Sequence, residues 1–513
     1  MTAGPSEAAA WAASGAMFLT GRPDGPPLGP PARFVERLRA VGDILSRTSG
    51  DLGRRLEVDV LALLGERAAL AGLHRGGDVS CGGAARLLPA ADGWLAVNLP
   101  RPDDVDLLPA WLADAGLGPA RISELANGGS PATEPAPANP ERIAYRNGGQ
   151  SAPTPAGSPA NWGADAAAGP GRAAWRVVAA AVAAGRARPL AERAQLLGLA
   201  VAAVPDRPAA VRLAAGPFAG LPLGSTEIGS GKPSANLDGL VVADLSSLWA
   251  GPLCTNLLQQ AGARVIKIES VHRPDGTRRG PPVFFDLLHA GQESVALDFG
   301  TPEGRAHLRL LLGAVDVVVE GSRPRALEQL GIVAETVLAE ATGTGAGPRV
   351  WVSITGYGRA APGRDRVAFG DDAAAAGGLV VCDETGPCFC ADAVADPCTG
   401  TVAAAAVLRA LSVGGRWLLD ISMRDVAAHL AGPAPAGSVA APAGSVAAPA
   451  GSVAGPAGSV AGPAGSGAGP AGSGAGAVMA APPRARAVVG RGPGLGEHTE
   501  AVFAELGPAR RGR

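Results

Sequence analysis

Between residues 237 and 269 a short apolar run, an amphipathic segment and a second apolar run follow one another. The run VVADLS (241–246) predicts a strand, LCTNLLQQAG (253–262) predicts a helix, and RVIKIE (264–269) predicts a second strand. A turn with the sequence LWAGP separates the first strand from the helix. It lacks the G-x-G-x-x-G pattern of dinucleotide-binding turns, so the pattern does not favour a dinucleotide site.

The same alternation continues to residue 432. PEGRAHLRLLLGA carries Pro302 and Glu303, which suit the first turn of a helix, and RALEQLG predicts a short helix that ends at Gly331. VDVVVE (315–320) is almost continuously apolar, as are parallel strands buried on both faces. We therefore predict an α/β fold with a doubly wound, mostly parallel, Rossmann-like domain over 236–432. Ligands should lie beyond the carboxyl ends of its strands.

Two stretches interrupt the pattern because their composition cannot build a core. The sequence PAGS recurs every seven residues between 434 and 476, and each repeat contains a proline and no large apolar residue, which excludes a coiled coil. We expect residues 433–480 to be a disordered repeat linker. Residues 128–170, rich in Pro, Gly, Ala and Asn, predict a second low-complexity linker.

Three further regions flank the linkers. We expect residues 1–127 to be small-domain-like and partly duplicated, because SGAMFLTGRPDGPP near the start parallels GGLVVCDETGPCFC further along the chain. This places a smaller α+β domain N-terminally. Residues 171–230 are predicted to be the helical remainder of that region. Residues 481–513 are expected to be a tail that packs on the Rossmann-like domain.

Charge and cysteine content exclude several classes of protein. The formal net charge is -2, which gives no basis for a nucleic-acid surface, and no run of about 18 apolar residues predicts a membrane span. The first residues do not form a signal peptide, so we expect a cytoplasmic protein. The cluster of Cys382, Cys388, Cys390 and Cys398 lacks paired C-x-x-C spacing, so reduced thiols are favoured over a metal site.

Several phrases, taken in order, resemble family III CoA-transferases (the CaiB/BaiF group, which includes formyl-CoA transferase and α-methylacyl-CoA racemase). They are LDGLVVADLSSLWAGPLCTNLLQQAGARVIKIE, SVALDFGTPEGRAHLRLLL, VDVVVEGSRPRALEQLGI, VWVSITGYG and the closing GPGLGEHTEAVFAELG. The resemblance implies an acyl-CoA:carboxylate CoA-transferase that works through an aspartyl anhydride and an aspartyl-CoA thioester. Its substrates would be a coenzyme A thioester and a carboxylic acid, with no tightly bound cofactor, and the protein would be a homodimer.

The resemblance places the nucleophile at Asp396, in ADAVADPCTGTVAAAAVLRAL. A carboxylate in the first turn of a helix is favoured in its ionised form by the backbone amides and the helix dipole. An ionised carboxylate can attack a thioester directly. Two alternatives remain: Asp396 could serve only as the helix N-cap before Pro397, and Asp392 could be the nucleophile instead.

The resemblance also suggests the residues that contact the substrate. The expected CoA-binding residues are Leu248, Trp249, Ala250, Arg273, Arg278 and Gly321. Trp249 could stack on the CoA adenine or fill the core. Gly82 and Gly83 could donate backbone N–H groups to an oxyanion, or they could form a plain turn.

Departures from the family pattern keep two other functions open. The phrase HAGQES (289–294) stands where family members carry two cations, which favours the alternative of a catalytically inactive CoA-binding protein. The racemase or isomerase alternative needs a base beside the substrate α-carbon, but RVAFGDD (366–372) has no histidine. Asp371 or Asp372 could replace it only if burial raised the pKa of that carboxyl.

Overall fold

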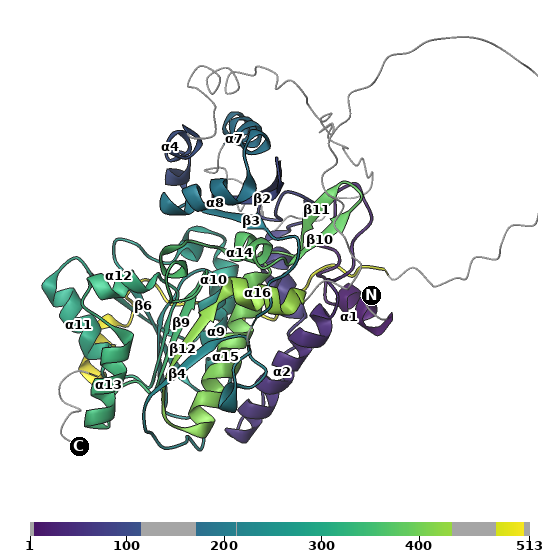
Figure 1. Cartoon of the computed structure of the whole chain (residues 1–513). Helices are drawn as coiled ribbons and strands as arrows, with labels where there is room; N and C mark the ends of the chain where they lie inside the picture. Colours follow the sequence, from purple (N-terminus) through teal and green to yellow (C-terminus); the bar gives the residue numbers. More distant parts are fainter. Residues whose placement is uncertain (1–4, 114–170, 212, 433–478, 507–513) are drawn as a thin grey trace, which may run out of the picture.

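The structure is a computed structural model that describes residues 5–113, 171–211, 213–432 and 479–506 (Figure 1). The predicted linker 128–170, and the predicted linker 433–480 apart from its last two residues, lie outside these ranges.

A twisted sheet of seven strands forms the centre of the described part of the chain, in the order β4-β12-β9-β8-β5-β6-β7. Its members are β4 (Gly224–Gly229), β5 (Val241–Leu245), β6 (Arg264–Ser270), β7 (Glu293–Leu297), β8 (Val317–Glu320), β9 (Val350–Thr355) and β12 (Arg416–Ser422). All neighbours pair in parallel except β4, which lies antiparallel on the edge next to β12. The predicted doubly wound, mostly parallel sheet is therefore confirmed, with its topological switch point between β5 and β8.

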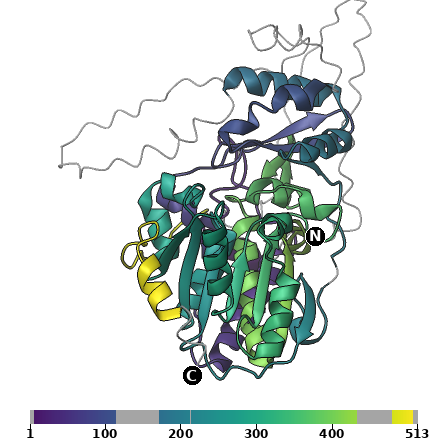
Figure 2. The same cartoon turned by 90° about the vertical axis from the view of Figure 1, so that its left-hand side faces the viewer.

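Helices cover both faces of this sheet (Figures 1 and 2). One face carries α2 (Phe34–Asp51), α9 (Ala250–Gln260), α10 (Pro282–His289), α15 (Ala395–Val413) and α16 (Met423–Ala431); the other carries α11 (Pro302–Leu312), α12 (Pro324–Gln329), α13 (Ala334–Thr344) and α17 (Thr499–Leu506). Val317 and Val319 of β8 point into the first core and Val318 points into the second. This alternation explains why VDVVVE is apolar at nearly every position.

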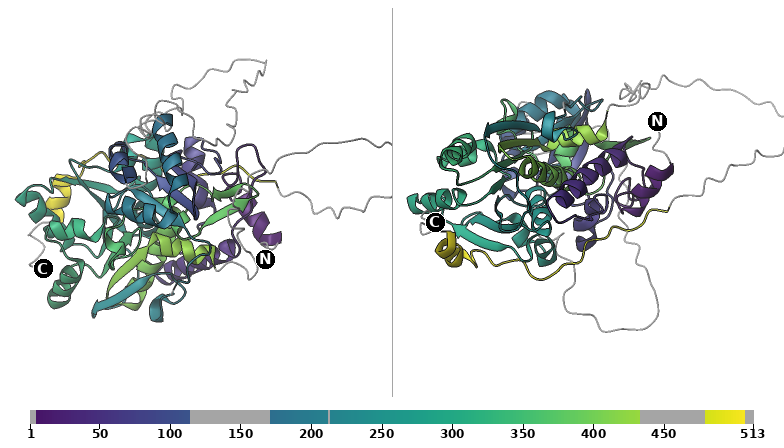
Figure 3. Two further views of the ribbon diagram at one scale, coloured as in Figure 1. Left: turned by 45° about the horizontal axis from the view of Figure 1, so that its top comes forward. Right: turned by 90° about the horizontal axis from the view of Figure 1, so that it is seen from below.

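The first part of the chain packs on the large sheet and is not a separate small domain. It contains α1 (Pro5–Ala13), α2, the 3-10 turn η1 (Ala62–Gly65) and α3 (Glu66–Ala71). Helix α2 buries Leu38 and Leu45 and lies beside the alanine-rich α15 (Figure 3). Residues 14–27, predicted to be a duplicate of 377–390, form no hairpin like that of β10 (Val380–Asp383) and β11 (Gly386–Phe389).

The smaller α+β unit is assembled from two separate stretches of chain. The strands β1 (Ala85–Ala90), β2 (Gly93–Asn98) and β3 (Ala200–Val204) form an antiparallel sheet, covered by α4 (Leu108–Leu112), α7 (Arg172–Ala184) and α8 (Ala187–Leu196). It packs on α14 (Gly370–Ala376), above the carboxyl ends of the large sheet (Figures 1 and 2).

Residues 171–230 are not purely helical, contrary to the prediction. They also supply β3 to the small sheet and β4 to the edge of the large sheet. Alanine-rich segments such as AVAAV carry no clear period, so pairing with distant strands decides their structure. The remaining 3-10 turns are η2 (Pro102–Asp104), η5 (Gly216–Phe218), η6 (Gly276–Arg279) and η7 (Gly363–Asp365).

The described C-terminal segment crosses the molecule before it ends in α17 beside β7 (yellow in Figures 2 and 3). Arg486 binds Glu66 of α3 through two side-chain nitrogens and also donates to Asn256 of α9. The segment thus links the N-terminal helices to the large sheet. In the part of the chain described by the structure, no helix is both long and apolar enough to cross a bilayer.

Candidate active site

Asp396 lies where the N-termini of two helices meet. Helix α15 begins at Ala395 with Val394 as its N-cap, so Asp396 sits inside the first turn and is not the capping residue. Its half-buried carboxylate accepts a hydrogen bond from the backbone N–H of Gly370, the first residue of α14. A Cβ at Gly370 would stand 2.4 Å from Asp396 Oδ2, so this contact requires glycine.

The environment of Asp396 opposes its ionisation. Burial raises the pKa of Asp396 to about 7; Arg67 lowers it, whereas Asp371 and Asp392 raise it further. The expectation of a carboxylate held ionised by helix amides is therefore wrong in direction. The amide of Gly370 does favour the charged form, but burial and two neighbouring carboxyl groups outweigh it.

Asp392 is fully buried and committed to an ion pair. Arg67 Nε lies 2.9 Å from Asp392 Oδ2, and Arg67 Nη2 binds Oδ1. The flanking Ala391 and Ala393 adopt φ values of 53° and 43°, which alanine rarely takes. Such strain persists where surrounding contacts impose it, and the ion pair with Arg67 is one of these contacts. Asp392 is therefore the ion-pair partner of Arg67, and its alternative role as the nucleophile stays a prediction.

Helix α14 supplies two further carboxyl groups, Asp371 and Asp372. Burial raises the pKa of Asp371 to about 6, with a further rise from Asp392, and its Oδ1 accepts the N–H of Ala393 at 3.1 Å. Burial raises the pKa of Asp372 well above its usual range, and its Oδ1 accepts a hydrogen bond from Asn98 Nδ2 at 2.8 Å. Both carboxyls therefore have the raised pKa that a base in place of the missing histidine would need.

The glycine loop 80–83 packs against this group of carboxyls. The Ser80 side chain is hydrogen-bonded to Asp371, and a Cβ at Gly82 would stand 3.4 Å from Arg67 Nη2. Gly83 donates its N–H to the carbonyl of Ser80 at 2.8 Å, which closes a plain turn. Because the Gly83 amide is already used, Gly82 remains the candidate oxyanion donor.

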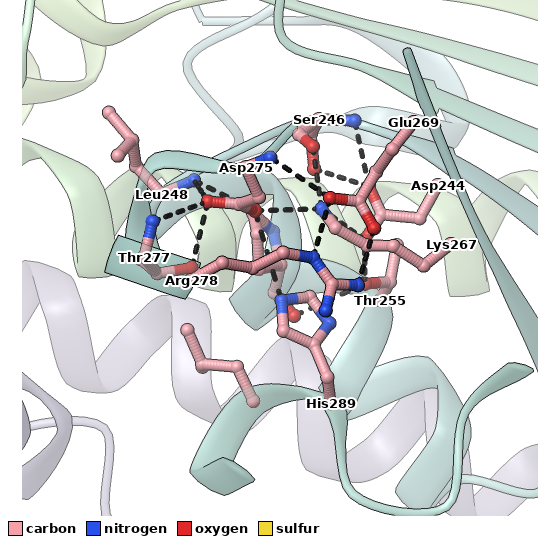
Figure 4. Close-up of polar contacts among 12 residues, drawn as sticks. Asp244, Ser246, Leu248, Thr255, Lys267, Glu269, Asp275, Thr277, Arg278 and His289 are labelled. Carbon is pink, nitrogen blue, oxygen red and sulfur yellow. Dashed lines mark hydrogen bonds and ion pairs between the residues drawn. The ribbon is translucent and has the colours of Figure 1, made fainter. Parts of the chain in front are cut away.

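The turn that contains Leu248, at the carboxyl end of β5, is held by a buried polar network (Figure 4). The ammonium of Lys267 lies 2.9 Å from Asp275 Oδ2 and donates to the carbonyl of Ser246 at 2.6 Å. Burial alone would raise the pKa of Asp275, but Lys267 holds it well below its usual range. Asp275 Oδ1 in turn accepts the N–H of Leu248, which has φ 70° and is 37% exposed.

Arg278, one of the predicted CoA-binding residues, is part of the same network (Figure 4). Its guanidinium binds both oxygens of Glu269 and donates to the carbonyl of Pro493 in the C-terminal segment. His289 is fully buried, and burial lowers its pKa to about 4, so the ring is neutral at pH 7. Arg278 therefore has a structural role in this structure, and its contact with CoA stays a prediction.

Trp249 and Ala250 are core residues. The Trp249 ring is 2% exposed and packs edge-on against Phe284, with ring centroids 5.5 Å apart. A Cβ at Gly400 of α15 would stand 2.6 Å from the carbonyl of Ala250, so α9 and α15 touch there. Of the two uses considered for Trp249, filling the core is the observed one, because its ring is not accessible to an adenine.

A cluster of arginines lies at the switch-point side of the sheet. Arg273 is exposed, and Arg323 follows β8 as the N-cap of α12. Burial lowers the pKa of Arg323, and the charges of Arg325, Arg101 and Arg273 lower it further, whereas Asp365 raises it. Within the described residues, neither Arg273 nor Arg323 forms an ion pair. The predicted Gly321 lies at the same edge, where a Cβ would stand 3.3 Å from that of Ser246.

Comparison with known proteins shows which family this part of the chain resembles. Residues 237–457 match the model of CoA-transferase family III. This segment, called the family III segment below, is similar to that family. It contains Asp371, Asp392 and Asp396, whereas Arg67 and loop 80–83 lie outside the family III segment.

Curated relatives match over the same part of the chain. Succinyl-CoA–D-citramalate CoA-transferase from Chloroflexus aurantiacus is 33% identical over 29% of this chain and 38% of its own length. Formyl-CoA:oxalate CoA-transferase from Escherichia coli is 30% identical over 38% of this chain and 50% of its own length. A CAIB/BAIF family protein of known structure from Brucella suis is 29% identical over 38% of this chain and 54% of its own, with a TM-score of 0.33. The chain spans half or less of the length of these curated relatives.

Sequence reasoning missed two cations: Arg67, which lies outside the family III segment, and Arg323, which lies within it. Arg67 lies 325 residues from its partner Asp392, and no local pattern predicts that contact. Arg323 stands in the phrase SRPR after an apolar strand, at the carboxyl edge where a ligand was expected. Its place after β8 was the signal that could have identified it.

Proposed function

We propose that this protein transfers coenzyme A between an acyl-CoA thioester and a carboxylic acid, with Asp396 as nucleophile. The observation that carries the proposal is the position of Asp396: a half-buried carboxyl, free of ion pairs within the described residues, at the meeting point of α14 and α15. The curated relatives named above carry out CoA transfer, which supports the same reaction for this chain.

The chemistry needs no proton at the nucleophile. A carboxylate oxygen of Asp396 attacks the thioester carbonyl, the C–S bond breaks, and the CoA thiolate leaves behind a mixed anhydride. The thiolate then attacks the aspartyl carbonyl and releases the donor acid, which yields an aspartyl-CoA thioester. An acceptor carboxylate reverses these two steps. Gly82 is the candidate N–H donor to the oxyanion of each tetrahedral intermediate.

CoA carries phosphates, which the arginine cluster could bind. Arg273 and Arg323 have no ion-pair partner among the described residues, and the charge of Arg273 contributes to the lowered pKa of Arg323. Guanidinium groups bind phosphate with paired hydrogen bonds. They are the substrate-binding cations in this proposal and compensate for those missing from HAGQES (289–294). A cytoplasmic location and a homodimer remain predictions from the sequence.

Hydroxylamine trapping tests the reaction directly. The full-length protein is incubated with an acyl-CoA and hydroxylamine, and the peptide that contains Asp396 is weighed. A hydroxamate at Asp396, absent without acyl-CoA, supports the proposal. Asp396→Asn should lose both the adduct and CoA exchange, whereas Asp43→Asn on the exposed face of α2 should retain them. CoA exchange by Asp396→Asn at the unmodified rate would refute the proposal.

The raised pKa of Asp371 favours a second candidate, acyl-CoA racemisation or isomerisation. A carboxyl with a pKa of about 6 beside Asp396 is suited to accept an α-proton near neutral pH. Deuterium entering the α-carbon of acyl-CoA in D2O, without CoA exchange, would favour this reaction. CoA retention with neither signal would favour the inactive CoA-binding alternative.

A further inference from the structure

We propose that Arg67 is a positioning residue for Asp396, supplied by the N-terminal region from outside the family III segment. Its guanidinium fixes Asp392 beside the helix that carries Asp396 and is the cation that balances the carboxyl cluster. This inference rests on the proposed function, because it concerns the same site.

The contacts of Arg67 place its guanidinium between the carboxyls and the glycine loop. Two of its nitrogens bind the two carboxylate oxygens of fully buried Asp392, and its central carbon lies 5.6 Å from the ring centroid of Trp249. A Cβ at Gly82 would stand 3.4 Å from Arg67 Nη2. The strained backbone at Ala391 lies directly before Asp392, and such strain persists only where contacts like this ion pair impose it. Without Arg67 a buried carboxylate would have no compensating charge.

A second ion pair anchors the helix that carries Arg67. Its neighbour Glu66 is 1% exposed and binds Arg486 through both carboxylate oxygens. Arg486 also donates to Asn256 of α9, on the same face of the sheet. Segments from both ends of the chain thus hold Arg67 in one place, which suits a positioning role.

The charges that face Asp396 are few. Asp371 comes from α14, Asp392 from the segment before α15, and Arg67 from α3. Two thiols lie near these groups: Cys398 of α15 beside Asp396, and Cys81 of the glycine loop near Asp371, Asp392 and Arg67. Burial raises the pKa of each well above its usual range, so both are neutral at pH 7. Among the described residues Arg67 is thus the single cation of this group, and removing it takes away the positive charge that these residues supply to the three carboxyls.

The test measures the titration of Asp396 without requiring catalysis. The full-length protein is labelled at different pH values with a carbodiimide and an amine, which modify protonated carboxyls, and the Asp396 peptide is quantified by mass spectrometry. Arg67→Gln should raise the labelling midpoint by about one pH unit or more. Arg67→Lys, which keeps the charge, should stay near the unmodified midpoint. Near neutral pH the kcat of CoA exchange should fall about tenfold in Arg67→Gln, with little change in KM.

A matched control distinguishes the effect of removing a charge at the site from the effect of losing any ion pair between the N-terminal region and the family III segment. Arg22 also joins the N-terminal region to the family III segment, through Asp383, and Arg22→Gln should leave the Asp396 midpoint unchanged. If Arg67→Gln does not fold, Arg67→Gln combined with Asp392→Asn removes the unpaired charge. In Asp392→Asn alone, which retains Arg67, the midpoint of Asp396 should then lie at a lower pH than in this double variant.

An unchanged midpoint in folded Arg67→Gln, or equal midpoints in the Asp392→Asn pair, would overturn the inference. If the unmodified protein exchanges no CoA, the proposed function fails. The labelling midpoints still decide whether Arg67 controls Asp396, so the two failures are distinguishable.

Discussion

Replacing Asp396 by asparagine should remove CoA transfer and yet stabilise the fold at alkaline pH. The pKa of Asp396 is raised from 3.8 to about 7 in the folded protein. The folded state therefore holds its proton more tightly than the unfolded chain, and stability is lost as pH rises from about 4 to about 7. At about 1.4 kcal/mol for each pH unit, three units give an upper bound of about 4 kcal/mol. Because Asp396 is only partly buried, screening by solvent reduces this to about 1–3 kcal/mol.

Urea unfolding at pH 4 and pH 8 measures this effect. Asparagine keeps an oxygen for the Gly370 amide but carries no charge, so the variant should match the unmodified protein at pH 4 and exceed it at pH 8. Asp43→Asn makes the same change in net charge at an exposed position and serves as the control. A variant that is less stable than the unmodified protein at pH 8, or more stable by the same amount at both pH values, would refute the electrostatic reasoning.

Four other substitutions test the packing and the ligand site. Arg486→Gln leaves buried Glu66 unpaired and should cost about 2–4 kcal/mol of unfolding free energy in urea titration. Gly400→Ala inserts a methyl group 2.6 Å from a carbonyl of α9 and should cost at least about 1–3 kcal/mol in the same assay. Gly343→Ala on α13 meets no atom within 4 Å and should instead stabilise by about 1 kcal/mol. Arg323→Gln should raise KM for acyl-CoA about tenfold with kcat retained, and an unchanged KM would exclude Arg323 from phosphate binding.

The large sheet was predictable because its signals are local. Each apolar run between 241 and 355 is short, is bounded by turn residues and is followed by a helical segment, so the parallel direction of the strands and the hand of their connections could be predicted. The run VDVVVE even indicated that β8 is covered on both faces. The position of Asp396 near a helix N-terminus was also predictable, since Pro397 marks the first turn.

The protonation state of Asp396 was not predictable from the sequence, because it depends on contacts between distant segments. A helix N-terminus alone favours the ionised form, but Asp371 and Asp392 reach the same place through other elements. The burial of Trp249 likewise depends on Phe284 and on α15, neither of which is adjacent in sequence. Alanine-rich residues 200–204 carry no period, and only pairing with β2 makes them a strand.

The location of Arg67 and loop 80–83 bears on how the site is assembled. The family III segment supplies the carboxyls, but the cation and the glycine loop come from residues that precede it by more than a hundred positions. The N-terminal helix α2 also covers α15, whose buried face would otherwise be exposed. A fragment limited to the family III segment would therefore lack both the charge balance of Asp396 and part of the core that holds its helix. For this reason the N-terminal region is part of the candidate active site and not an appendage to it.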